Sequence, residues 1–297
     1  MVPRVVVVRR KTDYELLLHQ HGTHEQARFF LKSRDQDVDR VRERHEHVTA
    51  LSSRVTGAIP SAWRRAQVDR SDLHRFLFEP EDILVAFGQD GLVANLAKYL
   101  DGQPVIGINP EPEHNDGVLV PCRAEHTREL LEAAATKTAA IERRTMVAAE
   151  LDDGQRLVAL NEVFVGHRSH QSARYQIRWR TNDERQSSSG VVVTTGTGAT
   201  GWARSIHRQR YTAVQLPSPE ERRLAFFVRE AFPSVATGTE LTDGTLADDD
   251  SVELVSRMDG GGVVFGDGIE DDRLTFGWGR RLRIGVASQT LALVRPS

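Results

Sequence analysis

Continuous apolar runs alternate with polar, helix-like segments over the first third of the chain. Three short runs are apolar and rich in β-branched residues, as expected of strands buried on both faces: residues 4–8, 82–88 and 104–109. Residues 24–56 place apolar side chains at irregular helical spacing among charged ones and predict one or two helices, and residues 91–100 predict another. Strand, helix and strand joined by short links predict a Rossmann-like α/β domain with a parallel sheet.

The pattern changes near the middle of the chain. Residues 125–145 are dense in Ala, Glu and Leu and predict one helix. Beyond it, short β-rich runs recur between turn signals such as Asp152–Gly154 and Thr181–Asp183. Such runs predict a β-rich, mostly antiparallel domain. We therefore divide the chain into an α/β domain, 1–122, and a β-rich domain, 123–297, whose last segment is a candidate to pack back on the first.

The composition describes a globular protein and gives no sign of a nucleic-acid or membrane partner. Of 297 residues, 39% are hydrophobic and 27% are charged, and the formal net charge of −3 gives no electrostatic argument for binding nucleic acid or a membrane surface. No apolar run approaches the roughly 18 residues of a membrane span. The single cysteine, Cys122, excludes an internal disulfide framework and a thiolate zinc cluster. We expect a cytoplasmic protein without a signal segment.

The tetrapeptide Gly88-Gln89-Asp90-Gly91 closes the second predicted strand and opens a helix. Ligands of open parallel sheets bind at this carboxyl end of the strands, and the unpaired N–H groups of a helix start suit a phosphate. Asp90 is therefore a candidate functional acid. A plain helix N-cap is the alternative role for Asp90.

Two polar features interrupt the β-rich half. Asn161-Glu162 lies inside the apolar run 157–165, where an Asn amide can pair with a base edge and a Glu carboxylate with a ribose diol. A Glu that points to solvent is the alternative. The segment SSGVVVTTGTGATGW, 188–202, ends a β-branched strand in small residues that let a backbone approach a ligand, although a ligand-free glycine-rich turn stays open. Asp267, in a predicted hairpin turn, is a further candidate to face a substrate.

Together these segments resemble the NAD kinase family, which shares its α/β domain with diacylglycerol and sphingosine kinases. Members carry a GGDG loop, an Asn-Glu pair after Ala-Leu, and a turn of the form TPTGSTAY. This chain has, in the same order and spacing, GQDG at 88–91, ALNE at 159–162 and TTGTGATGW at 194–202. The stretches RRKTDYE (9–15) and GINPEPEHNDG (107–117) are similar to the divergent mitochondrial-type branch. The resemblance covers nearly the whole chain.

The resemblance implies transfer of the γ-phosphoryl group of ATP, with Mg²⁺, to the adenosine 2′-hydroxyl of NAD, giving NADP. It implies that Asp90 is the catalytic base and that Gly88, Gln89 and Gly91 bind substrate beside it. The residues that it implies for NAD binding are Asn161, Glu162, Thr197, Gly198, Thr200, Gly201 and, at the nicotinamide end, Asp183. It implies no metal ligand from the protein. Dimers are usual in the resembling branch, so we expect a homodimer.

Gln89 departs from the family pattern because it replaces the second glycine of GGDG. Its side chain either crowds the triphosphate of ATP or bonds to it. Two other functions stay open: a catalytically weak NAD(P)-binding sensor or regulatory protein, and a lipid kinase of the same superfamily. The lipid kinase is disfavoured, because ALNE with TGTG points to a dinucleotide. The residues also leave open the donor, ATP or polyphosphate, and the preference between NAD and NADH.

Overall fold

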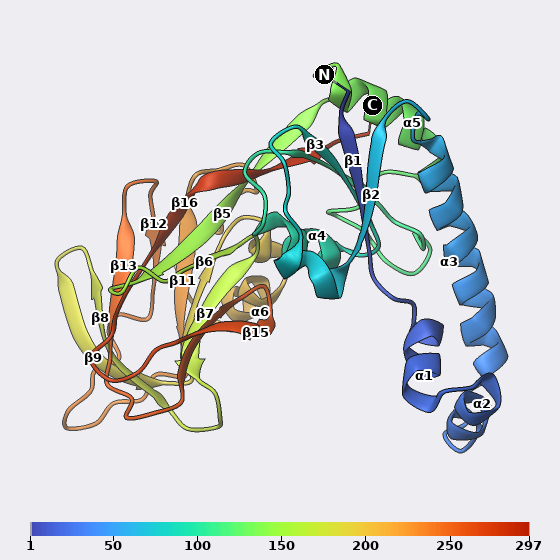
Figure 1. Cartoon of the computed structure of the whole chain (residues 1–297). Coiled ribbons are helices and arrows are strands. Elements are labelled where there is room, and N and C mark those ends of the chain that lie inside the picture. Colours follow the sequence, from blue (N-terminus) through green and yellow to red (C-terminus); the bar gives the residue numbers. More distant parts are fainter. Residues whose placement is uncertain (1, 297) are drawn as a thin grey trace. The chain divides into compact units, whose positions relative to one another are not determined.

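The chain forms two compact units, and the computed structural model describes residues 2–296 of it (Figure 1). The first unit runs through Ile141 and takes in the C-terminal segment from Ala292, and the second is Glu142–Leu291. The sequence-based boundary after residue 122 therefore lies one helix short of the observed division. No helix of the described chain is long and apolar enough to cross a membrane.

Helix α5 (Thr127–Ala135) accounts for the difference between the two boundaries. Its residues Leu130 and Leu131 are buried in the core of the first unit. The single helix predicted over 125–145 is too long. Lys137 has a φ of +58°, which a continuing helix does not allow, and strand β5 (Ile141–Leu151) follows.

The sheet of the first unit is parallel, in the order β2-β1-β3-β4, and the end of β16 pairs with β4. The bounds are β1 Arg4–Arg9, β2 Arg64–Asp69, β3 Asp82–Phe87, β4 Pro104–Ile108 and β16 Arg281–Val294. The chain passes from β1 to β2 on one side and then to β3 on the other. The strand order thus reverses between β1 and β3, and ligands of open sheets bind beyond the carboxyl ends of strands at such a point.

Helices α3 and α5 cover one face of this sheet, where Val55 packs with Val85 in a shared core. The segment 24–56 forms two helices, α2 and α3, and α4 packs against β3. Helix α1, which the pattern did not predict, begins at a capping box: Thr12 and Glu15 each accept the other's backbone N–H. The bounds are α1 Asp13–His21, α2 His24–Lys32, α3 Val38–Ala58 and α4 Asp90–Ala97.

The second unit contains two antiparallel sheets. One has six strands in the order β12-β11-β10-β7-β14-β15, and the other contains β16-β13-β8-β9 with the β5–β6 hairpin beside β16. The bounds are β6 Arg156–Ala159, β7 Glu162–His167, β8 Ala173–Trp179, β9 Asn182–Ser188, β10 Gly190–Thr194, β11 Leu224–Arg229, β12 Asp243–Leu246, β13 Ser251–Ser256, β14 Gly262–Gly266 and β15 Ile269–Thr275. The prediction of an α/β domain followed by a mostly antiparallel β-rich domain is confirmed.

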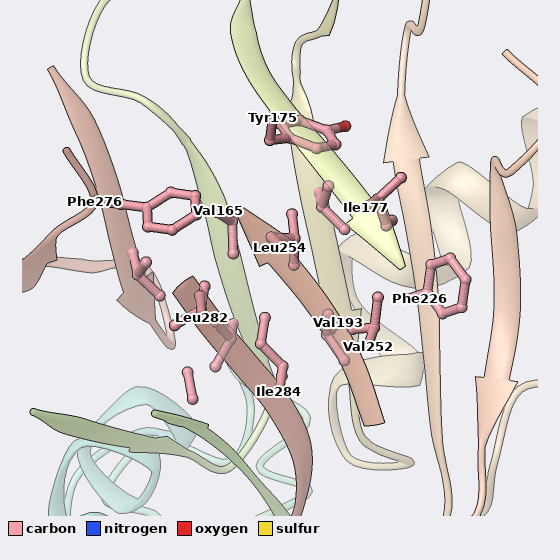
Figure 2. Packing of buried hydrophobic residues seen from close by; sticks show 14 of the residues in the cluster. Val165, Tyr175, Ile177, Val193, Phe226, Val252, Leu254, Phe276, Leu282 and Ile284 are labelled. Carbon is pink, nitrogen blue, oxygen red and sulfur yellow. The ribbon is translucent and has the colours of Figure 1, made fainter. Parts of the chain in front are cut away.

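The core of the second unit lies between its two sheets, where side chains such as Tyr175 and Phe226 are fully buried (Figure 2). Strand β10 shows how the sequence builds it. Val191 and Val193 enter this core, whereas Val192 packs on the other face with residues of α6 (Trp202–Gln209). Both faces of β10 are covered, which explains its continuous apolar run.

Candidate functional site

The Gly88–Gly91 loop joins β3 to α4 at the carboxyl edge of the first sheet. The N–H of Gly88 donates to the carbonyl of Ile108 at 3.0 Å and holds the loop against β4. Helix α4 begins at Asp90, and its N-cap residue is Gln89, which makes no side-chain capping bond. The alternative of Asp90 as a plain N-cap is therefore wrong.

The Asp90 carboxylate is held by the loop that follows β4. Its Oδ1 accepts the N–H of Leu119 at 2.8 Å, and its Oδ2 accepts the N–H of Val118 at 3.2 Å. The loop lies so close to β4 that a Cβ on Gly107 would be 2.1 Å from the Leu119 carbonyl oxygen. Each carboxylate oxygen keeps a further lone pair for a substrate hydroxyl. Asp90 is thus oriented by the protein before any substrate binds.

Gln89 causes no strain in the loop. Its backbone is extended, with φ −104° and ψ 170°, a conformation open to any residue. Its side chain is exposed. A glycine at this position is not required by the backbone, so the departure from GGDG affects only what the side chain contacts.

A cavity of about 550 Å³ in the first unit includes Gly88, Gln89 and Gly91 in its lining. Five cationic side chains line it as well: Arg10, Lys11, Arg40, Arg44 and Arg70. The sequence does not predict this set, because the five residues come from separate segments that only the fold brings together. The RRK stretch directly after the first strand was the one local signal.

In the second unit, the ALNE and TTGTG motifs are bonded to each other. Asn161 lies in the break between β6 and β7, and Glu162 begins β7, so the polar pair does not interrupt one strand as expected. Thr195 donates its N–H to the Asn161 carbonyl at 2.9 Å and its hydroxyl to the Leu160 carbonyl at 2.6 Å. A Cβ on Gly198 would lie 2.3 Å from the Asn161 carbonyl oxygen. The two motifs therefore fold as one piece of structure.

Asp267 fixes the backbone of this break. It forms the β14–β15 hairpin turn with Gly268, and both residues have positive φ, +54° and +69°, as in a type I′ turn. Its carboxylate accepts the N–H of Leu160 at 3.0 Å and the N–H of Asn161 at 2.6 Å. The sequence predicts a hairpin turn at Asp267 and makes this residue a candidate to face a substrate. The structure shows it as the acceptor that orders the ALNE segment.

The carboxyl group of Glu162 has a raised pKa because of its environment. Burial raises the pKa of Glu162 to about 7, and the nearby negative charge of Asp267 adds to the shift. Near neutral pH, Glu162 therefore exchanges between an ionised form that accepts hydrogen bonds and a protonated form that donates one.

Thr197 and Gly198 are buried in the turn that follows β10, whereas Thr200 and Gly201 are exposed. The hydroxyl of Thr197 accepts a guanidinium N–H of Arg144 at 3.3 Å, and Arg144 is only 3% exposed. A buried cation thus supports the turn. Arg144 lies on β5 outside every recognisable motif, so no sequence pattern identifies it.

Asp183 belongs to a separate cluster on the β8–β9 hairpin. It is exposed and accepts hydrogen bonds from Gln176 at 2.5 Å and from Arg178 at 3.0 Å. The bond from Gln176, followed by the bond and charge of Arg178, lowers the pKa of Asp183. In the described part of the chain, its hydrogen-bond partners all lie on this hairpin.

Known proteins resemble this chain in sequence, although no protein-family model matches it. It is 26% identical over 263 residues to NAD kinase 2, mitochondrial, of Rattus norvegicus, and the match covers 71% of this chain and 62% of the relative. The protein of the same name from Homo sapiens is also 26% identical, with 71% of this chain and 60% of the relative covered. The chain thus spans less than two thirds of the length of these curated relatives.

Solved structures resemble it in fold. The crystal structure of an NAD kinase from Archaeoglobus fulgidus in complex with ATP matches with a TM-score of 0.60 and 18% identity, over 98% of this chain and 93% of that one. Yeast NADH kinase complexed with NADH matches with a TM-score of 0.63 and 14% identity, over 100% and 84%. The resemblance to the NAD kinase family is confirmed.

The motifs that resemble those of NAD kinases divide between the two units. GQDG lies in the first, with an oriented carboxylate and a cation-lined cavity. ALNE and TTGTG lie in the second, with Asp267 and Arg144 as structural supports that the motifs do not contain.

Proposed function

We propose that this protein is an NAD kinase, which transfers the γ-phosphoryl group of ATP to the adenosine 2′-hydroxyl of NAD and gives NADP and ADP. The observation that carries this proposal is the direct bonding of ALNE to TTGTG through Thr195 and the Asn161 carbonyl. The family resemblance connects both motifs with the dinucleotide. The names of the sequence relatives, and the ATP and NADH bound in the similar structures, support the same substrates.

Asn161 and Glu162 bind the adenosine part of NAD in this proposal. Within residues 2–296, the Asn161 side-chain amide has no hydrogen-bond partner, so its donor and acceptor are both available to a base edge. The Glu162 carboxyl group pairs with ribose hydroxyls. The remaining NAD-binding residues are Thr197, Gly198, Thr200 and Gly201 around the turn, and Asp183 at the nicotinamide end.

Asp90 is the catalytic base. As the bond from the 2′-oxygen to the γ-phosphorus forms and the bond to the leaving oxygen of ADP breaks, the hydroxyl proton passes to the Asp90 carboxylate. In a loose phosphoryl-transfer transition state the proton leaves late, so a positioned carboxylate is a sufficient base. Mg²⁺ enters with ATP and neutralises phosphate charge. Gly88, Gln89 and Gly91 lie beside the donor phosphates.

Neither alternative function gains a supporting observation. A blocked sensor requires Gln89 to close the loop to a triphosphate, whereas its side chain is exposed at a cavity. A lipid kinase has no use for an ordered ALNE segment that bonds to a glycine- and threonine-rich turn.

We propose a cytoplasmic homodimer as the working form. The single cysteine, Cys122, is free and buried in the core of the first unit, which suits a reducing compartment. Strands β12 and β15 end the six-stranded sheet and offer edges for pairing between copies. Light scattering after size-exclusion chromatography should give twice the chain mass, and a monomer at every concentration would contradict the dimer.

The test is incubation with ATP, Mg²⁺ and NAD, followed by an NADP-specific dehydrogenase that reports NADP. We expect NADP to accumulate. Parallel reactions with NADH and with inorganic polyphosphate identify the preferred acceptor and donor. Binding of NAD without NADP formation from either donor would indicate a sensor, and phosphorylation of diacylglycerol instead of NAD would indicate a lipid kinase.

A further inference from the structure

The cavity beside the GQDG loop, here called the basic cleft, carries a local charge opposite to that of the chain. Its five cationic side chains, Arg10, Lys11, Arg40, Arg44 and Arg70, face only two lining carboxylates, Asp13 and Glu111. The whole chain has a formal net charge of −3. An excess of positive charge in one concave place favours an anionic ligand, because such a cleft concentrates the field.

The cations of the basic cleft differ in whether the protein already uses them. Arg44 forms a two-pronged pair with Glu111, and Arg10 lies 3.7 Å from Asp13. Lys11, Arg40 and Arg70 are exposed and have no hydrogen bond or ion pair to any described residue. The three without a partner are therefore available to a ligand.

The topology explains why Arg10, Lys11 and Arg70 meet the GQDG loop. Arg10 and Lys11 directly follow β1, Arg70 follows β2, and the Gly88–Gln89 pair follows β3, so the basic cleft lies at the carboxyl ends of neighbouring parallel strands. The strand order reverses between β1 and β3. Open α/β sheets bind ligands at this point.

We infer that the basic cleft binds the oligophosphate chain of the phosphoryl donor, with Lys11, Arg40 and Arg70 as its phosphate ligands. This inference rests on the proposed kinase function. Guanidinium groups bind phosphate oxygens in pairs, and lysine adds a compact charge. The one phenyl ring in the lining, Phe87, is 4% exposed, so the cleft offers charge rather than a stacking face for a base.

The test compares Arg40→Gln and Arg70→Gln with the control Arg42→Gln. Arg42 is an exposed arginine on the same helix as Arg40, pairs with Asp39 at 3.0 Å, and does not line the cleft. Calorimetry measures the dissociation constants of tripolyphosphate, ATP with Mg²⁺, and NAD for each protein. Circular dichroism confirms that every variant folds.

We expect Arg40→Gln and Arg70→Gln each to raise the tripolyphosphate and ATP constants at least about tenfold, equivalent to about 1.4 kcal/mol. The NAD constant should stay unchanged, and Arg42→Gln should change none of the three by more than about twofold. If the unmodified protein binds ATP far more tightly than tripolyphosphate, the donor is a nucleotide. If the two affinities are equal, the donor is inorganic polyphosphate. Both results support the cleft.

Three results would overturn the inference: no tripolyphosphate binding to the unmodified protein, equal weakening by Arg42→Gln, or weakening of NAD binding alone. Its failure differs from failure of the proposed function. If Arg40→Gln forms NADP normally and has an unchanged KM for the donor, the proposed kinase function stands and donor binding in the basic cleft is rejected. If tripolyphosphate binding depends on Arg40 but no NADP forms, phosphate binding in the basic cleft stands and the proposed kinase function is rejected.

Discussion

Each unit contains one motif-bearing region, here called its corner: residues 88–91 in the first unit, and residues 159–162 with 194–202 in the second. The two corners are built in opposite ways. The ALNE–TTGTG corner of the second unit is bonded within itself, because Thr195 and Asp267 hold the backbone of Leu160 and Asn161 from two sides. The GQDG corner of the first unit opens on a cleft whose cations are in part unpaired. A fixed set of polar groups suits a largely neutral adenosine, and exposed cations suit a polyanion. In the proposed kinase, a fixed shape would therefore select the dinucleotide, and positive charge would select the phosphoryl donor.

The largest effect should come from Asp90→Asn. Loss of the carboxylate base should lower turnover at least about a hundredfold while NAD binding persists. The Asn amide has only one oxygen to accept the backbone N–H groups of Leu119 and Val118, so one of these bonds is lost. Thermal unfolding must therefore be measured alongside turnover. Asp101→Asn, an exposed aspartate past the other end of α4, is the control. Unmodified turnover in Asp90→Asn would remove this residue from the chemistry.

Asp267→Asn tests whether the second corner depends on preset geometry. The change removes a charged acceptor from two backbone N–H groups, an interaction worth about 1.5–3 kcal/mol. NAD affinity should fall about ten- to a hundredfold, with a lower melting temperature, while tripolyphosphate affinity stays unchanged. Calorimetry with both ligands decides. An unchanged NAD affinity would show that this hairpin does not order the NAD-binding segment.

Glu162 makes the second corner sensitive to pH. With a pKa of about 7, its carboxylate forms mainly between pH 6 and 8, so NAD should bind up to about tenfold more tightly at pH 8 than at pH 6. Glu162→Gln should remove this dependence. A wild-type NAD affinity that is constant from pH 6 to 8 would contradict ribose recognition by the ionised form.

The same pKa shift acts on stability with a defined sign. Because the folded pKa lies above the ordinary value of 4.5, the folded protein binds more protons between about pH 4.5 and 7. The contribution of Glu162 to stability is complete below that window and is lost as the pH rises to about 7. Denaturant unfolding of Glu162→Gln across the window should show a shallower decline than the unmodified protein.

Asn161→Ala should have the smallest effect. The backbone of Asn161, and not its side chain, carries the bonds to Thr195 and Asp267, so the fold of the corner should survive. Loss of side-chain bonds to adenine should weaken NAD binding by roughly 0.5–1.5 kcal/mol, or about two- to tenfold. ATP binding should be unaffected. Equal losses for NAD and ATP would count against adenosine recognition.

The sequence predicts those elements that are buried on both faces. Residues 82–88 are apolar almost throughout and predict β3 to within one residue. Strand β2 is missed because only Val68 of its six residues is buried, as an edge strand permits. The strand expected around residues 157–165 is broken at Asn161, because Asp267, 106 residues away, captures its backbone N–H.

In the candidate site, too, the sequence predicts local patterns and misses contacts between distant segments. Asp90 and the ALNE and TTGTG motifs are local patterns, and a resemblance identifies them. Asp267 acts through a hairpin turn, and the basic cleft gathers Arg10, Arg40 and Arg70 from separate segments. Such residues acquire their neighbours only from strand order and turn geometry, which no local pattern contains.

The most direct test of the proposed function follows the phosphoryl group itself. The protein is incubated with Mg²⁺ and ATP labelled with ³²P at the γ-position, together with NAD or with NAD that lacks the adenosine 2′-hydroxyl. An NAD kinase should place the label in NADP when NAD is the acceptor and leave the 2′-deoxy compound unlabelled. Equal labelling of both dinucleotides, or no labelled NADP at all, would contradict the proposed function.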